Sequence, residues 1–146
     1  KLTNLKTLNL CRNERISNFG IFPLVNLTFL NLSGNDSITD SGISNLTKLR
    51  ELRLGDNLYI TDESIKKLTG ITSLYLNHNR FITNESIKTL INLENLEVHH
   101  QDSSISSEAI FYLTNLRSLK INNTWIFTSE LISLTHLKII DSRLDY

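Results

Sequence analysis

Four side chains that could bind a metal ion or respond to pH stand in a regular pattern: Asp56, His78 and His100 are spaced 22 residues apart, and His99 lies beside the last. Two imidazoles and one carboxylate can hold a divalent transition metal. Histidine also changes its charge at about pH 6.5, so these residues could make a contact pH-sensitive. A straight column does not converge its donors on one point, and no HExxH or CxxC motif is present. We therefore expect no metal site, and we interpret the histidines as exposed polar residues at the margin of a binding surface.

Motifs that carry catalysis are absent from the sequence. The chain contains no GxSxG, no GxxxxGK[ST] and no GxGxxG. Its one cysteine, Cys11, has no histidine placed by a recognised pattern, so we interpret it as an ordinary free thiol. We expect no enzyme activity, no catalytic residue and no cofactor.

Composition narrows the class of partner. Lys+Arg and Asp+Glu both number 15 in the 146 residues, so the chain lacks the basic surplus of a nucleic-acid-binding protein. No apolar run approaches the roughly 20 residues that cross a bilayer. We expect a protein partner, with no nucleic acid, no membrane span and no small-molecule substrate. Because Met is absent and Lys1 enters a repeat already in progress, we also expect a fragment of a longer chain.

The segments that position Asp56 and the three histidines belong to a sequence repeat. ITDESIKKLTG at 60–70 returns as ITNESIKTLIN at 82–92, and the pattern LxxLxLxxN runs through the chain. Its copies begin at Leu5, Leu27, Leu49, Ile71, Leu93, Leu116 and Leu137, with spacings of 22, 22, 22, 22, 23 and 21 residues. A unit that recurs in this way cannot bury its apolar face alone, so the copies must stack.

Each position of the repeat has a physical meaning. The two leucines of LxL point to one face of a short strand and the residue between them points to the other, because side chains alternate along a strand. The Asn that follows should bond to turn groups that would otherwise be buried and unpaired. Ile60, Ile65 and Leu68 then mark a short helical or 3₁₀ segment on the convex side, for which Thr61 and Asp62 are suitable N-caps.

This pattern resembles the leucine-rich-repeat family over essentially the full length. The resemblance implies an α/β solenoid with a parallel concave sheet and short convex helices. We expect one domain over 1–146, with six full repeats and part of a seventh. The ITDxSIxxL segment is similar to the coils of F-box leucine-rich-repeat proteins, whereas the 22-residue length is similar to internalins, so the subfamily stays open.

Two outward columns on the concave sheet are the candidate partner-binding surface. The column between the core leucines contains Asn9, Asn31, Arg53, Tyr75, Glu97, Lys120 and Asp141. The column before it contains Thr7, Phe29, Glu51, Ser73, Asn95, Ser118 and Ile139. Arg and Tyr are enriched in binding hot spots. We place the contact at Asn31, Arg53, Tyr75, Glu97, Lys120, Phe29 and Glu51, with His78, His99 and His100 at its margin; alternatively, these side chains only satisfy one another.

A second patch is expected where the repeat becomes irregular. Gln101 and Thr124 stand at the positions of the ladder Asn, and aromatic residues gather around this break. They are Phe111, Tyr112, Trp125 and Phe127. Exposed aromatics there predict a docking patch; local packing of the shifted coils is the alternative.

The resemblance implies protein–protein recognition, and three narrower roles remain open. They are substrate recognition in an F-box ubiquitin ligase, adhesion at a surface as in internalins, and a structural role inside a larger assembly. Sequons occur at Asn26, Asn31, Asn35, Asn45, Asn84 and Asn122. A glycan would not fit at a ladder residue such as Asn35 and would obstruct the concave face at Asn31. We therefore expect an intracellular, cytoplasmic location.

Overall fold

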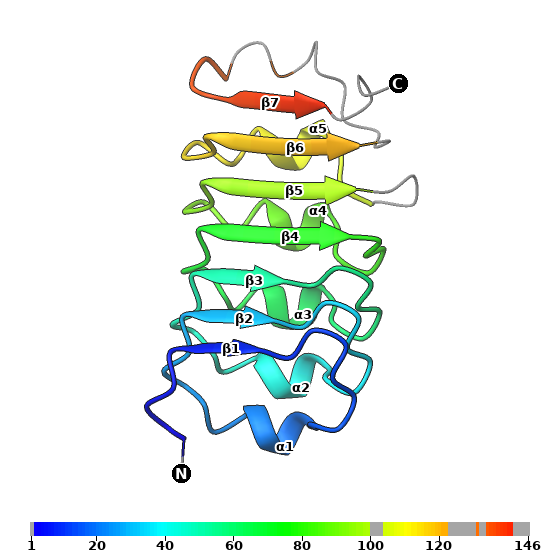
Figure 1. Ribbon diagram of the computed structural model, residues 1–146. Coiled ribbons are helices and arrows are strands. Elements are labelled where there is room, and N and C mark those ends of the chain that lie inside the picture. Colours follow the sequence, from blue (N-terminus) through cyan, green and yellow to red (C-terminus); the bar gives the residue numbers. More distant parts are fainter. Residues whose placement is uncertain (1, 100–103, 123–130, 132–133, 142–146) are drawn as a thin grey trace.

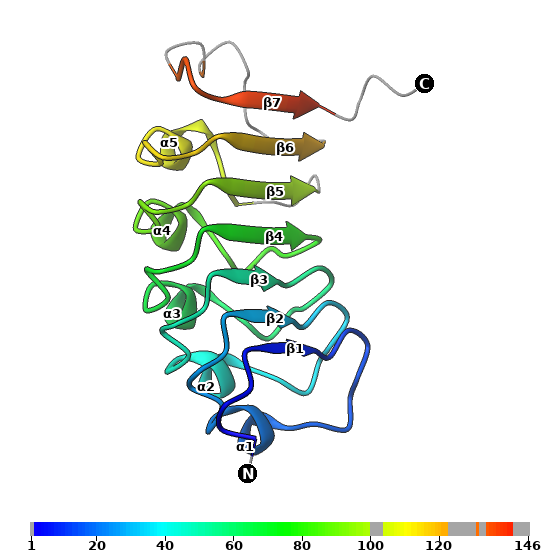
Figure 2. The same cartoon turned by 60° about the vertical axis from the view of Figure 1, so that its left-hand side comes forward.

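The protein is described by a computed structural model for residues 2–99, 104–122, 131 and 134–141. Within those residues the chain forms a stack of coils, with the strands on one side and the short helices on the other (Figures 1 and 2). The strands are β1 (Thr7–Asn9), β2 (Phe29–Asn31), β3 (Glu51–Arg53), β4 (Ser73–Asn77), β5 (Asn95–His99), β6 (Ser118–Asn122) and β7 (Lys138–Asp141). The helices are α1 (Asn18–Ile21), α2 (Asp40–Ile43), α3 (Asp62–Ile65), α4 (Asn84–Ile87) and α5 (Ser107–Ile110). The predicted α/β solenoid is confirmed.

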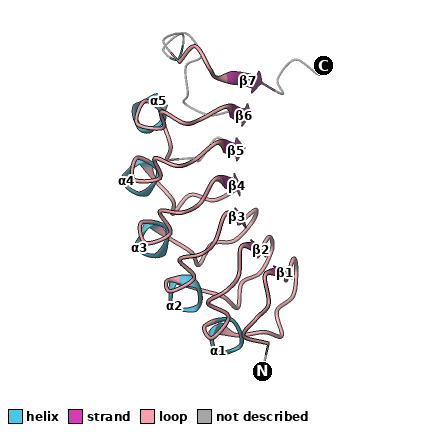
Figure 3. Cartoon of the chain, turned by 90° about the vertical axis from the view of Figure 1, so that its left-hand side faces the viewer, coloured by secondary structure: helices cyan, strands magenta, loops and turns pink. Residues whose placement is uncertain are grey.

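The strands form one parallel sheet in the order β1 to β7. Leucines pair with leucines across the strands, for example Leu30 with Leu52 and Leu52 with Leu74. The strands lie along the inner side of the curved stack and the helices along the outer side (Figure 3). This curvature follows from the unequal widths of the two sides, because helices need more room between coils than paired strands do.

The last strand departs from the predicted register. Ile139 pairs with Leu119 and Ile140 pairs with Lys120, so the predicted places of Ile139 and Asp141 in the two columns are wrong by one residue. The last coil enters its strand one residue sooner after the preceding turn than the coil before it does. Alignment of the leucines alone cannot reveal such a shift.

The core is a continuous row of aliphatic side chains between the sheet and the helices. The inward residues of the strands, such as Leu52 and Leu74, and the helix residues, such as Ile65 and Ile87, are fully buried. Each such side chain contributes roughly 1.5–3 kcal/mol when it leaves water. No single coil could bury its leucines, so this stabilisation exists only in the stack.

A ladder of asparagines closes the side of the stack where the strands end. Asn57 is fully buried; its Nδ2 donates to the carbonyl oxygen of Asn35, and its Oδ1 accepts from the backbone N–H groups of Tyr59 and Ile60 at 3.1 and 3.0 Å. Asn79 repeats the link by donating to the carbonyl of Asn57 at 2.7 Å. The predicted role of this Asn is confirmed: it satisfies buried backbone groups that no sheet or helix bond reaches.

A second ladder runs along the convex helices. Asp40 accepts from the backbone N–H of Thr61 at 2.9 Å and from the Thr61 hydroxyl at 2.8 Å, and Asp62 holds Thr83 in the same way. Thr61 is the N-cap, as predicted, and its hydroxyl accepts from the N–H of Glu63 at 3.2 Å. The expectation that Asp62 also caps its own helix is wrong. It is the first helical residue, and its carboxylate bonds to the next coil.

The turn after each strand requires an unusual backbone. Arg12, Gly34, Asp56 and His78 all have positive φ, between 55° and 61°. Each is the third residue of a tight turn, as when the N–H of Asn57 donates to the carbonyl of Leu54, and this position favours Gly and tolerates Asp, Asn and His. At Gly34 an added Cβ would also lie 3.1 Å from Cγ of Arg12.

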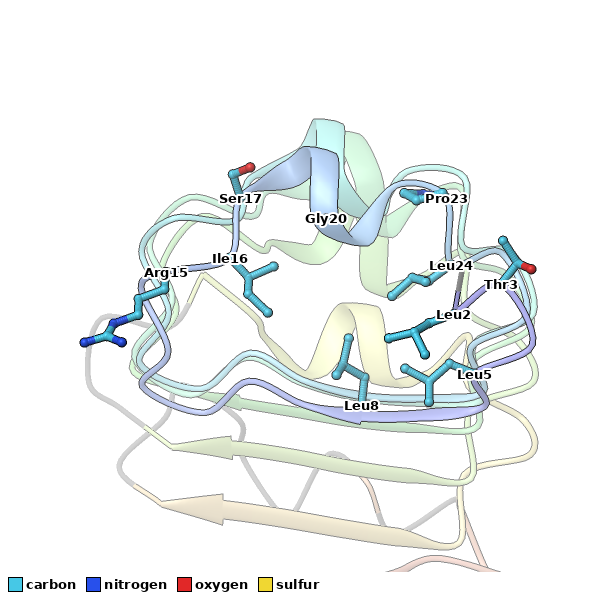
Figure 4. Close-up of a pocket in the computed structure, with 10 residues that line it drawn as sticks. All are labelled: Leu2, Thr3, Leu5, Leu8, Arg15, Ile16, Ser17, Gly20, Pro23 and Leu24. Atoms are coloured by element: carbon cyan, nitrogen blue, oxygen red, sulfur yellow. The ribbon is translucent and has the colours of Figure 1, made fainter.

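The first coil leaves the apolar interior open at one end. A cavity of about 690 Å³ is lined there by Leu2, Leu5, Leu8, Ile16 and Leu24, among others. Figure 4 shows these five side chains pointing into the space, while Arg15 points away from it. The corresponding leucines of the inner coils are fully buried because a neighbouring coil covers them.

Candidate protein-interaction surface on the concave sheet

The parallel register places one outward side chain per strand in a straight column. Asn31 pairs with Arg53, Arg53 with Tyr75, and Tyr75 with Glu97, which pairs in turn with Lys120. We call these five residues the central column. They face outward because the residues on either side of each in the sequence point into the core, as Leu52 and Leu54 do around Arg53.

Arg53 joins two aromatic rings across three strands. Its guanidinium carbon lies 5.6 Å from the ring centroid of Phe29 and 4.7 Å from that of Tyr75. Nε and Nη2 of Arg53 also contact Glu51 Oε1, at 2.8 and 2.7 Å. The hydrogen bond that Arg53 donates to the Glu51 carboxylate raises the pKa of Arg53. The four side chains therefore form a plate at the middle of the sheet, in which the rings hold the planar cation by cation–π contact.

Glu97 is the centre of a second cluster on the same surface. Its Oε1 accepts from Nδ2 of Asn77 at 3.2 Å and lies 3.4 Å from Nε2 of His99, while its Oε2 lies 3.4 Å from Nζ of Lys120. Nε2 of His99 makes no hydrogen bond to any described residue, so the 3.4 Å approach to Glu97 is an electrostatic contact only. Burial lowers the pKa of His99, although the Glu97 carboxylate opposes the shift.

Most of the predicted contact residues lie together on this surface. Phe29, Glu51, Arg53 and Tyr75 form the plate, and Glu97, Lys120 and His99 form the neighbouring cluster. Several of these side chains do satisfy one another, as the alternative interpretation expected. Their mutual contacts leave Arg53 and Lys120 with 43% and 46% of their side chains exposed, so the surface is organised and still accessible.

The remaining predicted residues lie at the edge of the surface or beyond the described chain. Asn31 is half-buried, and its Oδ1 accepts from the N–H of Ser33 at 3.0 Å. His78 is exposed in the turn after β4, where it has a positive φ like that of Asp56 in the preceding coil. His100 lies outside the described residues.

The second predicted patch is described only in part. Phe111 and Tyr112 follow α5 on the convex side and are exposed, as expected from their alignment with Lys66 and Lys67. Trp125 and Phe127 lie outside the described residues. The structure therefore places two of the four aromatics and leaves the proposed cluster untested.

Sequence reasoning missed one group of exposed apolar residues. Leu58, Tyr59 and Phe81 lie in the turns after the ladder Asn of two successive coils, and each is more than 40% exposed. The guanidinium of Arg80 lies over the Phe81 ring at 5.1 Å. Alignment of the repeats could have revealed them. The residue two places after the ladder Asn is polar in the first two coils, Arg15 and Ser37, but aromatic in the next two, Tyr59 and Phe81.

Two classes of site are not found in the part of the chain that the structure covers. No group of three or more His, Cys, Asp and Glu side chains there is arranged to hold a metal ion. Among the same residues, no helix has the length and apolar character needed to span a bilayer.

Comparison with known proteins agrees with the repeat and the fold. The family described as Leucine Rich repeat matches residues 24–46 and 45–68. The structure is similar to that of an internalin (inlF) of Listeria monocytogenes, with 32% sequence identity over 94% of this chain and a TM-score of 0.69. The chain is built of leucine-rich repeats.

Other solved structures are similar to this leucine-rich-repeat chain. Internalin C2 (inlC2) of Listeria monocytogenes shares 25% identity over 99% of the chain, with a TM-score of 0.73. A leucine-rich-repeat protein of Leptospira interrogans shares 27% identity over 95%, with a TM-score of 0.68. The chain spans 47%, 76% and 38% of inlF, inlC2 and the Leptospira protein, respectively. None of the curated proteins matches the chain.

Proposed function

We propose that this leucine-rich-repeat chain binds a protein partner through its concave sheet, with contact centred on Arg53 and Tyr75. Leucine-rich-repeat proteins generally mediate protein–protein interactions, and their curved sheets present extended binding surfaces. The observation that carries the proposal is the Phe29–Arg53–Tyr75 plate at the middle of the sheet. Arg, Tyr and Trp are enriched in hot spots, and aromatic residues bury a large area with little loss of side-chain freedom.

The surface is also preorganised for binding. Arg53 is already fixed by Glu51 and by the two rings, so a partner that contacts it need not order it. Binding costs about 0.5–1.5 kcal/mol for each flexible side chain that becomes immobile. A surface whose central cation already has these contacts avoids part of that cost.

Affinity capture from the source cells, followed by mass spectrometry, tests the proposal. The bait Arg53→Ala/Tyr75→Ala/Glu97→Ala should lose the partner that the unmodified chain captures. A matched bait on the opposite side, Glu63→Ala/Lys66→Ala/Lys67→Ala, changes three exposed convex residues and should retain it. If the convex bait loses the partner and the concave bait keeps it, the concave proposal is wrong.

Narrower roles have unequal support. An adhesin of internalin type is favoured by the similarity to two internalins. A substrate-recognition module of an F-box ligase rests only on the ITDESI segment at 60–65 and its resemblance to F-box coils. A scaffold role predicts that another chain covers the aromatic region around Trp125, of which Phe111 and Tyr112 are described and exposed. The identity of the captured partner distinguishes these three.

We also propose a cytoplasmic location, which is the alternative to the adhesin role and is supported by the hydrogen bonds and burial of the sequon asparagines. The Nδ2 groups of Asn26, Asn45 and Asn84 donate hydrogen bonds to neighbouring coils, and Asn35 is fully buried. N-glycosylation attaches to this nitrogen, so glycans would compete with contacts between coils. Secretion of the chain from eukaryotic cells followed by peptide N-glycosidase treatment tests the argument; a large mobility shift in folded protein would contradict it.

A further inference from the structure

The row of cation–π contacts on the concave face ends at Tyr75. It alternates ring, cation and ring on successive strands, with Phe29 on β2, Arg53 on β3 and Tyr75 on β4. The next residue of the central column is Glu97 on β5, which is neither a ring nor a cation. Arg53 contacts Tyr75 from the β3 side, and the β5 side of Tyr75 borders on a hollow.

That hollow has the chemistry to receive a cation. It measures about 230 Å³ and is lined by Tyr75, Asn95, Leu96, Glu97, Ser118 and Lys120. An aromatic ring on one side and a carboxylate on another attract the same ligand, because a cation is stabilised both by the ring face and by the negative charge. Asn95 and Ser118 add oxygen acceptors that suit an ammonium or guanidinium group.

Glu97 is only weakly satisfied on the side of the hollow. Its Oε1 is engaged by Asn77, but its Oε2 has Lys120 at 3.4 Å. Charge-assisted hydrogen bonds are usually about 2.7–2.9 Å long. The pair leaves 46% of the Lys120 side chain and 17% of the Glu97 side chain exposed. Its long contact makes Lys120 an internal cation that a better-placed one can displace. By contrast, Glu51 holds Arg53 at 2.7 Å and is not available.

We propose that the protein partner inserts a lysine or arginine side chain into this hollow. The cation lies on the Tyr75 ring opposite Arg53, pairs with Oε2 of Glu97 and displaces Lys120. This inference rests on the proposed function, because it names the chemistry of the partner at the same concave surface. It identifies the occupant as a basic segment by charge complementarity with Glu97.

The direct test is a titration of the ¹⁵N-labelled chain with the peptide acetyl-Gly-Arg-Gly-amide, followed by NMR. Saturable shifts are expected at the amides of Tyr75, Glu97 and Ser118, with a dissociation constant on the order of 1 mM. The citrulline peptide of the same length, which lacks the charge, should produce no saturable shift. If the citrulline peptide shifts these amide signals as strongly as the arginine peptide does, the proposal is overturned.

Three variants refine the test. Glu97→Gln and Tyr75→Leu should each weaken the binding of the arginine peptide about tenfold. Tyr75→Phe keeps the ring and should keep the affinity. Lys120→Gln should tighten binding about two- to fivefold, because the internal competitor is gone. Glu63→Gln on the convex helix α3 is the matched carboxylate control and should leave the affinity for the arginine peptide unchanged.

Failure of this inference is distinguishable from failure of the proposed function. If the arginine peptide causes no saturable shift in a folded chain, or if Glu97→Gln leaves its affinity unchanged, the basic occupant is excluded. The concave surface would still be supported if the Arg53→Ala/Tyr75→Ala/Glu97→Ala bait loses its captured partner. If that bait keeps the partner while the peptide titration succeeds, the hollow binds cations but the partner docks elsewhere.

Discussion

The guanidinium of Arg53 lies 4.7 Å from the ring centroid of Tyr75 on the neighbouring strand, and it is bonded at the same time to Glu51. One side chain thus connects a salt bridge to an aromatic plate. A point charge at this position could form the pair with Glu51, but only a planar cation can also stack on two rings. The planarity of arginine is therefore the property on which the surface depends.

Replacing Arg53 by lysine separates these two contributions. Arg53→Lys should keep the charge and lose the stacking, and it should lower the free energy of unfolding by about 0.5–1 kcal/mol because the site is partly exposed. Urea denaturation followed by circular dichroism measures the change. Arg53→Met provides the control that keeps a long apolar stem without charge; if it is as stable as the wild type, the cation–π contacts do not stabilise the fold.

Asn57 offers the strongest test of the repeat. Asn57→Ala removes one hydrogen bond to the coil before and two to its own turn, leaving buried backbone groups unpaired. The free energy of unfolding should fall by about 2–4 kcal/mol. Asn31→Ala is the matched control, because that side chain accepts one bond in a half-buried setting and should cost about 1 kcal/mol or less. Equal losses in the two variants would contradict the ladder argument.

The convex ladder predicts that Asp62 tolerates replacement by asparagine better than replacement by alanine. Asp62→Ala breaks the bonds to Thr83 at 2.9 and 2.6 Å and should cost about 1–2 kcal/mol. Asp62→Asn should stay within about 0.5 kcal/mol of the wild type. An amide can make both bonds, as Asn18 does with Thr39, where its Oδ1 accepts from the N–H and its Nδ2 donates to the hydroxyl. Thermal unfolding of the two variants decides it; a severe loss in Asp62→Asn would show that the negative charge is required.

His99 should make the fold less stable in mild acid. Burial lowers its pKa in the folded chain below the ordinary 6.5, so the unfolded chain binds the proton more readily. Stability from the neutral imidazole is present above about pH 6.5 and is lost as the pH falls towards the lower folded pKa. Glu97, Lys120 and His78 also act on this pKa. Urea midpoints at pH 7.5 and 5.5 should fall less in His99→Gln than in the wild type, and an equal fall would assign the effect to other groups.

Much of this structure follows from the sequence, because a strand alternates its side chains and a repeat stacks its copies. The spacing of Leu30, Leu52 and Leu74 is enough to place Arg53 and Tyr75 in one outward column. The ladder role of Asn57 follows from the same register, since a side chain at that position reaches the turn of the coil before. These are local rules that each coil obeys in the same way.

The orientations of long side chains between coils could be determined only from the tertiary structure. A column states which side chains are neighbours, but the rotamer decides that Arg53 lies between Phe29 and Tyr75, and that Asp62 turns to Thr83 rather than to its own helix. The early entry of the last strand likewise depends on how its coil packs on the one before. Long side chains and coil entries have several arrangements of similar local energy, and only packing against the neighbouring coil selects one of them.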